Sequence, residues 1–146
     1  PAPDTIPTDA KAAGLYMICT LAKQKAELKG FSDALMLDYR DQIAETTGAN
    51  IFFIKGSEIH TPIPDCFLDG ITRRTVIKIA EDLGMKVIER VLFLDDIKEF
   101  EQCFITGTAA EVTPVSEIDD IKFSVGDEIK KISSAYTELV NNWSGD

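Results

Sequence analysis

Two short segments place glycine and threonine where backbone N–H groups could bind a phosphate. Gly70-Ile71-Thr72 precedes a segment with helical periodicity, and a helix N-terminus presents unpaired N–H groups and a positive dipole end. Thr106-Gly107-Thr108-Ala109-Ala110 follows an apolar segment, where small side chains leave the N–H groups accessible and Thr108 adds a hydroxyl. Taken alone, each segment is more simply explained as a turn or a helix N-cap. A phosphate site therefore needs support from other features.

Cysteine and histidine offer little further chemistry. Cys19, Cys66 and Cys103 form no CxxC pattern, and their odd number argues against a disulfide scaffold. A reducing compartment, the cytoplasm, is therefore expected. The single histidine, His60, has no nearby Cys or His partner, so no metal site is expected.

Helical periodicity identifies the elements that would position the two segments. The clearest helix is Thr72–Leu83, with Thr72 as its cap and Gly84 at the C′ position. Asp9–Lys29 is predicted to form an earlier helix, closed by Gly30. Val125–Val140 is predicted to form the last helix, and its inward residues are expected to be Ile129, Ile132 and Leu139.

Short apolar segments predict a sheet between these helices. The candidate strands are Ala34–Leu37, Ile51–Ile54, Glu58–Thr61, Lys86–Leu92, Cys103–Ile105 and Val112–Val115, with a short helix at Leu94–Phe100. The order of a helix followed by strands with interspersed helices predicts an α/β fold with a mixed sheet.

Length and charge restrict the function classes. The 146 residues fit one domain, and the net charge is −10. Nucleic-acid binding needs a basic surface, so no nucleic-acid partner is expected. No apolar run reaches the roughly 18 residues that a membrane helix needs, so no membrane partner is expected.

Four motifs in order give these segments a common meaning. Four segments resemble, in the same order, the motifs of branched-chain amino-acid aminotransferases. They are the pair Lys11 and Tyr16, the segment Glu45 to Phe52, Gly70 to Arg73, and Thr106 to Val115. These are class IV, D-amino-acid-aminotransferase-like enzymes that use pyridoxal 5'-phosphate (PLP). The resemblance implies the large domain of the fold-type IV PLP enzymes, in which a mixed sheet forms a partly closed barrel with flanking helices.

The resemblance implies roles for individual residues. Lys11 matches the lysine that forms a Schiff base with PLP and moves the substrate proton. Glu45 matches the carboxylate facing the pyridine nitrogen, and Tyr16 the hydroxyl near the phenolic oxygen. Asn50 is expected to brace the loop that carries Glu45, or simply to form a turn.

The same resemblance implies that the two glycine segments bind the cofactor phosphate and the substrate. Gly70, Ile71 and Thr72 match one phosphate-binding turn, and Gly107 and Thr108 match the other. Ala109 and Ala110 match the turn whose N–H groups hold the substrate carboxylate. Two departures are Ala49, where the family often has an acidic residue, and Asp69, where it often has proline.

The implied reaction transfers the amino group between Leu, Ile or Val and 2-oxoglutarate, as in branched-chain amino-acid biosynthesis. Two alternatives stay open: another class IV enzyme (D-amino-acid aminotransferase or aminodeoxychorismate lyase), or a non-catalytic acidic binding domain. The family also implies a homodimer or higher homo-oligomer and a smaller amino-terminal domain. Residues 1–8 are therefore interpreted as a linker remnant and residues 9–146 as the PLP-binding large domain. We expect this chain by itself to be inactive.

Overall fold

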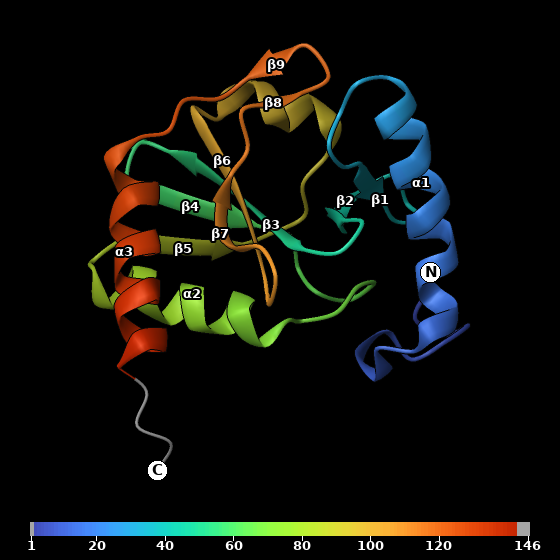
Figure 1. Cartoon of the computed structure of the whole chain (residues 1–146), viewed down its shortest axis with the longest axis horizontal. Coiled ribbons are helices and arrows are strands. Elements are labelled where there is room, and N and C mark those ends of the chain that lie inside the picture. The colour runs from blue at the N-terminus through green and yellow to red at the C-terminus, as the bar shows by residue number, and fades with distance from the viewer. Residues whose placement is uncertain (1, 143–146) are drawn as a thin grey trace.

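The computed structural model describes residues 2–142, and an open five-stranded sheet forms their centre (Figure 1). The strand order is β5-β4-β3-β6-β7. The bounds are Asn50–Lys55 for β3, Glu58–Thr61 for β4, Lys86–Glu89 for β5, Gln102–Gly107 for β6 and Glu111–Pro114 for β7. Only β4 and β5 run parallel, so the expected mixed α/β sheet is confirmed.

The partly closed barrel is not found in the described residues. Closure would require the sheet to continue until its edges meet. Instead, β5 and β7 stay as edges, and the remaining strands form two separate two-stranded sheets. These are β1 (Leu35–Leu37) with β2 (Ile43–Thr46), and β8 (Glu117–Ile118) with β9 (Ile121–Lys122).

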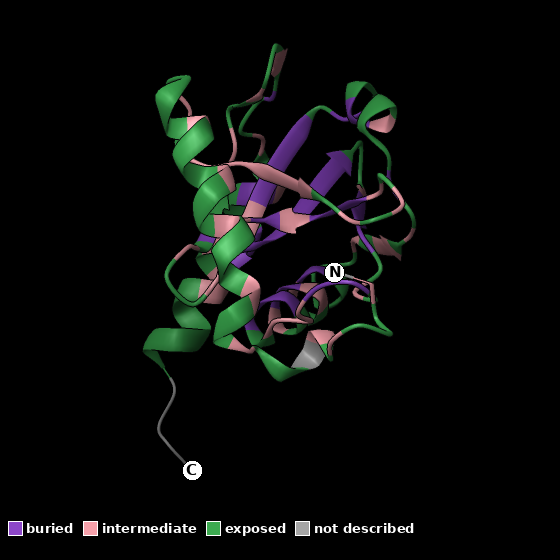
Figure 2. Cartoon of the chain, turned by 90° about the vertical axis from the view of Figure 1, so that its right-hand side faces the viewer, coloured by how far each residue is buried: buried purple, intermediate pink, exposed green. Residues whose placement is uncertain are grey.

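Alternation along β3 builds a core on each face of the central sheet. Phe52 and Ile54 pack on one face with residues of helices α2 (Ile71–Asp82) and α3 (Asp127–Asn141). Ile51 and Phe53 pack on the other face, against the 3-10 helix η3 (Leu94–Glu99) and neighbouring segments. Successive strand side chains point to opposite faces, so this continuous apolar run makes β3 the buried centre of the sheet (Figure 2).

The first helix is shorter than its apolar pattern predicted. Helix α1 spans Tyr16–Leu28, and two 3-10 turns, η1 (Thr8–Ala10) and η2 (Ala13–Leu15), precede it. Lys11 ends η1 in the left-handed conformation, with φ 46° and ψ 41°, which no α-helix can accommodate. The predicted helix from Asp9 was therefore wrong in its first two turns.

Other boundaries shifted for local reasons. Helix α2 begins one residue early, so Gly70 is its N-cap, and the predicted side-chain cap by Thr72 is wrong. Leu139 of α3 is half exposed rather than inward, because the core contacts of this helix end at Tyr136. Strand β2, which carries Glu45, was not predicted, since its four residues are too few to show a clear period. No helix within residues 2–142 is long and apolar enough to cross a membrane.

Candidate functional site

One cleft brings together three of the residues singled out by the sequence. Lys11, Tyr16 and Glu45 all line it, although 34 positions separate the first from the last. Its remaining wall is mostly apolar and includes Leu15, Ile18, Met36, Ala44, Phe67 and Leu68. The lining residues come from α1, β1, β2 and neighbouring segments. In Figure 1, α1 and the β1–β2 sheet lie next to each other, at the side of the molecule away from α3. A lysine, a phenol and a carboxylate therefore share one partly desolvated space.

Strand β2 determines how Glu45 enters this cleft. Ile43, Ala44 and Thr46 are buried, while Glu45 is half-buried and stands opposite Met36 of β1. Burial raises the pKa of Glu45 to about 7, and no hydrogen bond to a described residue offsets it. Such a carboxylate can accept a hydrogen bond from a cationic N–H group more strongly than a hydrated carboxylate can. This suits a protonated ring nitrogen.

Two residues of α1 sit near Glu45. Burial, followed by the charge of Glu45, raises the pKa of Tyr16 and of Cys19, so both groups stay protonated at neutral pH. Tyr16 can therefore donate a hydrogen bond into the cleft. Cys19 was not predicted to belong to the site, although its position three residues after Tyr16 places both on one helix face.

The left-handed conformation at Lys11 has a local cost and a geometric result. A non-glycine residue there stores roughly 1–3 kcal/mol of strain, which the surrounding structure must offset. The turn separates η1 from η2. The exposed Lys11 therefore lines the cleft without being part of α1.

The first glycine segment, Gly70-Ile71-Thr72, forms the start of α2. Gly70 is the N-cap, Ile71 is 76% exposed, and Thr72 is buried. The first N–H groups of a helix have no intrahelical partner, so those of Ile71 and Thr72 remain free for an anion.

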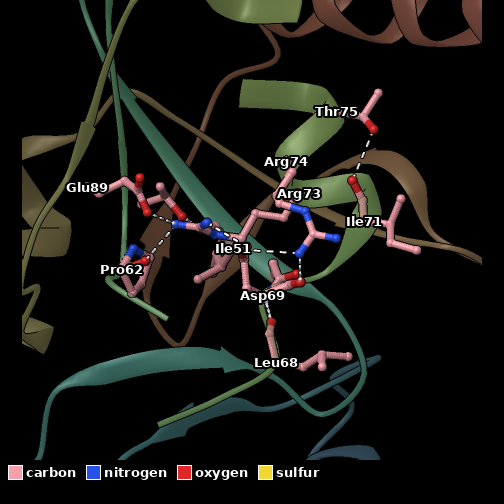
Figure 3. A network of polar contacts seen from close by, with 11 residues as sticks. Ile51, Pro62, Leu68, Asp69, Ile71, Arg73, Arg74, Thr75 and Glu89 are labelled. Carbon is pink, nitrogen blue, oxygen red and sulfur yellow. Dashed lines mark hydrogen bonds and ion pairs between the residues drawn. The ribbon is translucent and has the colours of Figure 1, made fainter. Parts of the chain in front are cut away.

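Arg73 holds this helix start in place (Figure 3). Its guanidinium is 2% exposed and contacts Asp69 at 2.8 Å, Glu89 at 2.6 Å and the Pro62 carbonyl oxygen at 3.1 Å. Asp69, which stands where the family often has proline, also accepts from Arg74 through its backbone oxygen at 2.8 Å. Ion pairs thus fix the turn that a proline ring would otherwise stiffen.

The second glycine segment spans the end of β6 and the connection to β7. Gly107 pairs with Glu111 across this hairpin, and Thr108 and Ala109 are exposed at its tip. The Ala110 carbonyl oxygen accepts a hydrogen bond from the Thr113 hydroxyl at 2.6 Å. The tip therefore offers small side chains and one free threonine, Thr108, to a ligand.

The two glycine segments meet at the connection between β2 and β3. The Asn50 amide donates to the Leu68 carbonyl oxygen at 2.9 Å, and a Cβ on Gly70 would lie 2.6 Å from Asn50 Oδ1. A Cβ on Gly107 would lie 3.4 Å from the Gly48 carbonyl oxygen. The Asn50 side chain therefore joins the start of β3 to the segment before Gly70, whereas Glu45 lies in strand β2 and not in a loop. None of the residues from Gly70 to Thr72 or from Gly107 to Ala110 lines the Lys11 cleft itself.

A second cluster of possible ligands lies beside the cleft. Oxygen and sulfur atoms of Asp38, Asp65 and Cys66 lie within 4.8 Å of one another. The Arg40 guanidinium already contacts both carboxylates, at 2.6 Å and 2.8 Å, and so supplies the positive charge. This cluster is an ion-pair network of the protein and not a candidate metal centre.

Gly70→Ala is expected to destabilise the fold by about 1–2 kcal/mol, because the new methyl group displaces Asn50 and breaks its hydrogen bond to Leu68. Urea unfolding measures the loss. Gly14→Ala is the control, since a Cβ there meets no atom within 4 Å. Adding Asn50→Ala should cost less in the Gly70→Ala background than alone. Additive losses would contradict the proposed contact.

Known proteins are similar to this chain in sequence and in fold. Residues 2–118 match the family model described as Amino-transferase class IV. A probable branched-chain-amino-acid aminotransferase of Rickettsia felis is 49% identical over 117 residues, which cover 80% of this chain and 40% of that protein. The branched-chain aminotransferase of Thermoproteus uzoniensis, solved with norvaline, gives a TM-score of 0.92 at 35% identity, covering 98% of this chain and 48% of that one.

A further solved structure contains a cofactor. An aminotransferase from Brucella abortus bound to PLP gives a TM-score of 0.91 at 36% identity, covering 97% of this chain and 51% of that one. The chain thus spans about half the length of these structures and 40% of the Rickettsia relative.

Proposed function

Because the chain belongs to the class IV aminotransferase family, we propose that it forms the PLP-binding part of a branched-chain amino-acid aminotransferase. The observation that carries the proposal is the cleft in which Lys11, Tyr16 and a desolvated Glu45 meet. Their identities match the attachment, phenolic-oxygen and ring-nitrogen positions of the family.

When bound, PLP draws electrons from the α-carbon of an amino acid and so makes its proton removable. Lys11 Nζ would attach the cofactor and then carry that proton. The Glu45 carboxylate would hold a proton at the ring nitrogen, and the Tyr16 hydroxyl would donate to the phenolic oxygen. The free N–H groups at the start of α2 and the Thr108 hydroxyl would bind the phosphate.

The proposed substrates are branched-chain L-amino acids and 2-oxoglutarate, with the substrate carboxylate near Ala109 and Ala110. Relatives named as branched-chain aminotransferases support the choice of amino acids. We further propose that residues 9–146 act with a second, amino-terminal domain, and that the complete protein works in the cytoplasm as a homodimer or higher oligomer.

The test is amino-group transfer by the complete protein that carries this chain. Leucine, isoleucine and valine are assayed with 2-oxoglutarate, and D-alanine and aminodeoxychorismate serve as competing substrates. Turnover restricted to the branched-chain L-amino acids supports the proposal. Preference for D-alanine or aminodeoxychorismate would move the protein to another class IV activity. A protein that takes up no PLP would be a binding domain.

Thr108→Val is expected to weaken PLP binding at least about tenfold, because a hydrogen bond to a charged group contributes roughly 1.5–3 kcal/mol. Valine keeps nearly the same volume and removes only the hydroxyl. Absorbance titration with PLP gives the affinity. Thr137→Val is the matched control, since its hydroxyl donates to the Ser133 carbonyl oxygen within α3 and Thr137 does not line the cleft. Equal affinity in both variants would exclude Thr108 from the phosphate site.

A further inference from the structure

We propose that Arg40 is a positioning residue that sets the distance between the ring site at Glu45 and the phosphate-binding turn at Gly70. It does so by fastening the loop of residues 62–68 to the β1–β2 hairpin. The inference rests on the proposed function, but neither the motifs nor the family resemblance pointed to Arg40.

The inner half of this fastening is a buried carboxylate that accepts several hydrogen bonds. Asp38, whose side chain is 3% exposed, accepts the backbone N–H groups of Arg40 at 2.7 Å and Gln42 at 3.0 Å. Its other oxygen accepts from Arg40 Nε at 2.8 Å and Nη2 at 2.6 Å. Burial acts to raise the pKa of Asp38, but these hydrogen bonds lower it overall, so Asp38 stays ionised. The guanidinium is thus held by the turn from which it arises.

The outer half reaches the loop. Arg40 Nη2 lies 2.8 Å and 2.9 Å from the two carboxylate oxygens of Asp65, and it donates to Cys66 Sγ at 3.2 Å. Asp38 and Cys66 also line the cleft that holds Glu45. One side chain therefore joins the hairpin of Glu45 to the loop of residues 62–68, which also contributes to the cleft lining.

That loop leads directly to the phosphate-binding turn. Leu68 lines the cleft, and Gly70 follows two residues later. Arg73 and Asn50 hold the two ends of the loop, at the Pro62 and Leu68 carbonyl oxygens, and Arg40 holds its middle. Without the Arg40 contact the middle of the loop would no longer be joined to the β1–β2 hairpin, so the segment from Leu68 to Gly70 would be less firmly placed relative to Glu45.

The contact is better suited to fixing geometry than to stabilising the fold. The Arg40 and Asp65 side chains are 31% and 44% exposed. Solvent largely screens ion pairs with this degree of exposure. PLP joins a ring and a phosphate covalently, so its affinity depends on the distance between their two sites. The affinities for pyridoxal and for inorganic phosphate, measured separately, do not depend on that distance.

The experiment compares these three ligands in the complete protein that carries this chain. Affinities for PLP, pyridoxal and inorganic phosphate are measured for the unmodified protein, Arg40→Ala and Asp65→Asn. The control is Lys55→Ala, which breaks an exposed ion pair, Lys55 with Glu99, between residues that do not line the cleft. We expect Arg40→Ala and Asp65→Asn to bind PLP more weakly, on the order of tenfold, and to bind pyridoxal and phosphate normally.

Three results would count against the proposal. Unchanged PLP affinity in both variants overturns it, as does equal weakening of all three ligands, which marks a merely structural role. Failure of the unmodified protein to bind PLP overturns the proposed function itself. If Arg40→Ala does not fold, Asp65→Asn decides alone, because it leaves the Asp38–Arg40 turn intact.

Discussion

Replacing Lys11 with alanine is expected to remove the attachment of PLP and to slow amino-group transfer by a factor on the order of 10³ or more. The Lys11 amine is proposed both to attach the cofactor and to carry the substrate proton, and a positioned proton carrier alone typically contributes 10²–10⁴-fold. Borohydride reduction followed by peptide mass spectrometry locates the pyridoxyl group. An assay with leucine and 2-oxoglutarate in the complete protein measures the rate.

Two further variants make this result specific. Lys11→Gly removes the same side chain and also relieves the strain of a Cβ in the left-handed conformation, so it should fold at least as well as Lys11→Ala. Lys23→Ala changes an exposed lysine on α1 and should leave both readouts unchanged. A pyridoxyl group on any lysine other than Lys11 would refute the assignment.

Glu45→Gln is expected to stabilise the cofactor-free chain at pH 8 by up to about 3 kcal/mol and to have little effect at pH 4. The cleft raises the pKa of Glu45 from its ordinary 4.5 to about 7, and each pKa unit corresponds to 1.36 kcal/mol. Below pH 4.5 both folded and unfolded chains keep the proton. Between pH 4.5 and about 7 the unfolded chain binds fewer protons, so the free energy of unfolding falls as pH rises. Glutamine cannot ionise and escapes this loss.

Urea unfolding at the two pH values measures the effect. Glu27→Gln, at an exposed position on α1, is the control and should change stability little at either pH. An equal effect of Glu45→Gln at pH 4 and pH 8 would show that burial of this carboxylate does not limit stability.

Glu45→Gln should also slow the reaction that the cleft is proposed to catalyse. A carboxylate placed to hold a proton on the ring nitrogen is worth roughly 10²–10³ in rate, the range measured for removing one preorganised group. We therefore expect Glu45→Gln to slow the proton shift in single turnovers far more than it weakens PLP binding. Near-normal single-turnover rates would make Glu45 a structural residue only.

Much of the fold could be predicted from local patterns. The run Ile51–Ile54 and the segment Glu58–Thr61 became β3 and β4, because β-branched and aromatic residues next to a glycine turn favour a hairpin. Helix α2 was predicted nearly to its bounds from its apolar face and from Gly84, whose φ of 78° suits a helix end. The prediction failed where one residue broke the period, as Lys11 does before α1.

The sequence by itself determined the central strands, the helices and the motifs that place this chain among the class IV aminotransferases, because these depend on neighbouring residues and their spacing. Only the tertiary structure decided which of the singled-out residues share a cleft, and that the sheet stays open. It also decided the raised pKa of Glu45 and the Arg40 contact with Asp65. Desolvation and ion pairing depend on side chains that are distant in sequence, such as Leu15, Phe67 and Asp65. A local sequence pattern does not show which distant side chains come into contact.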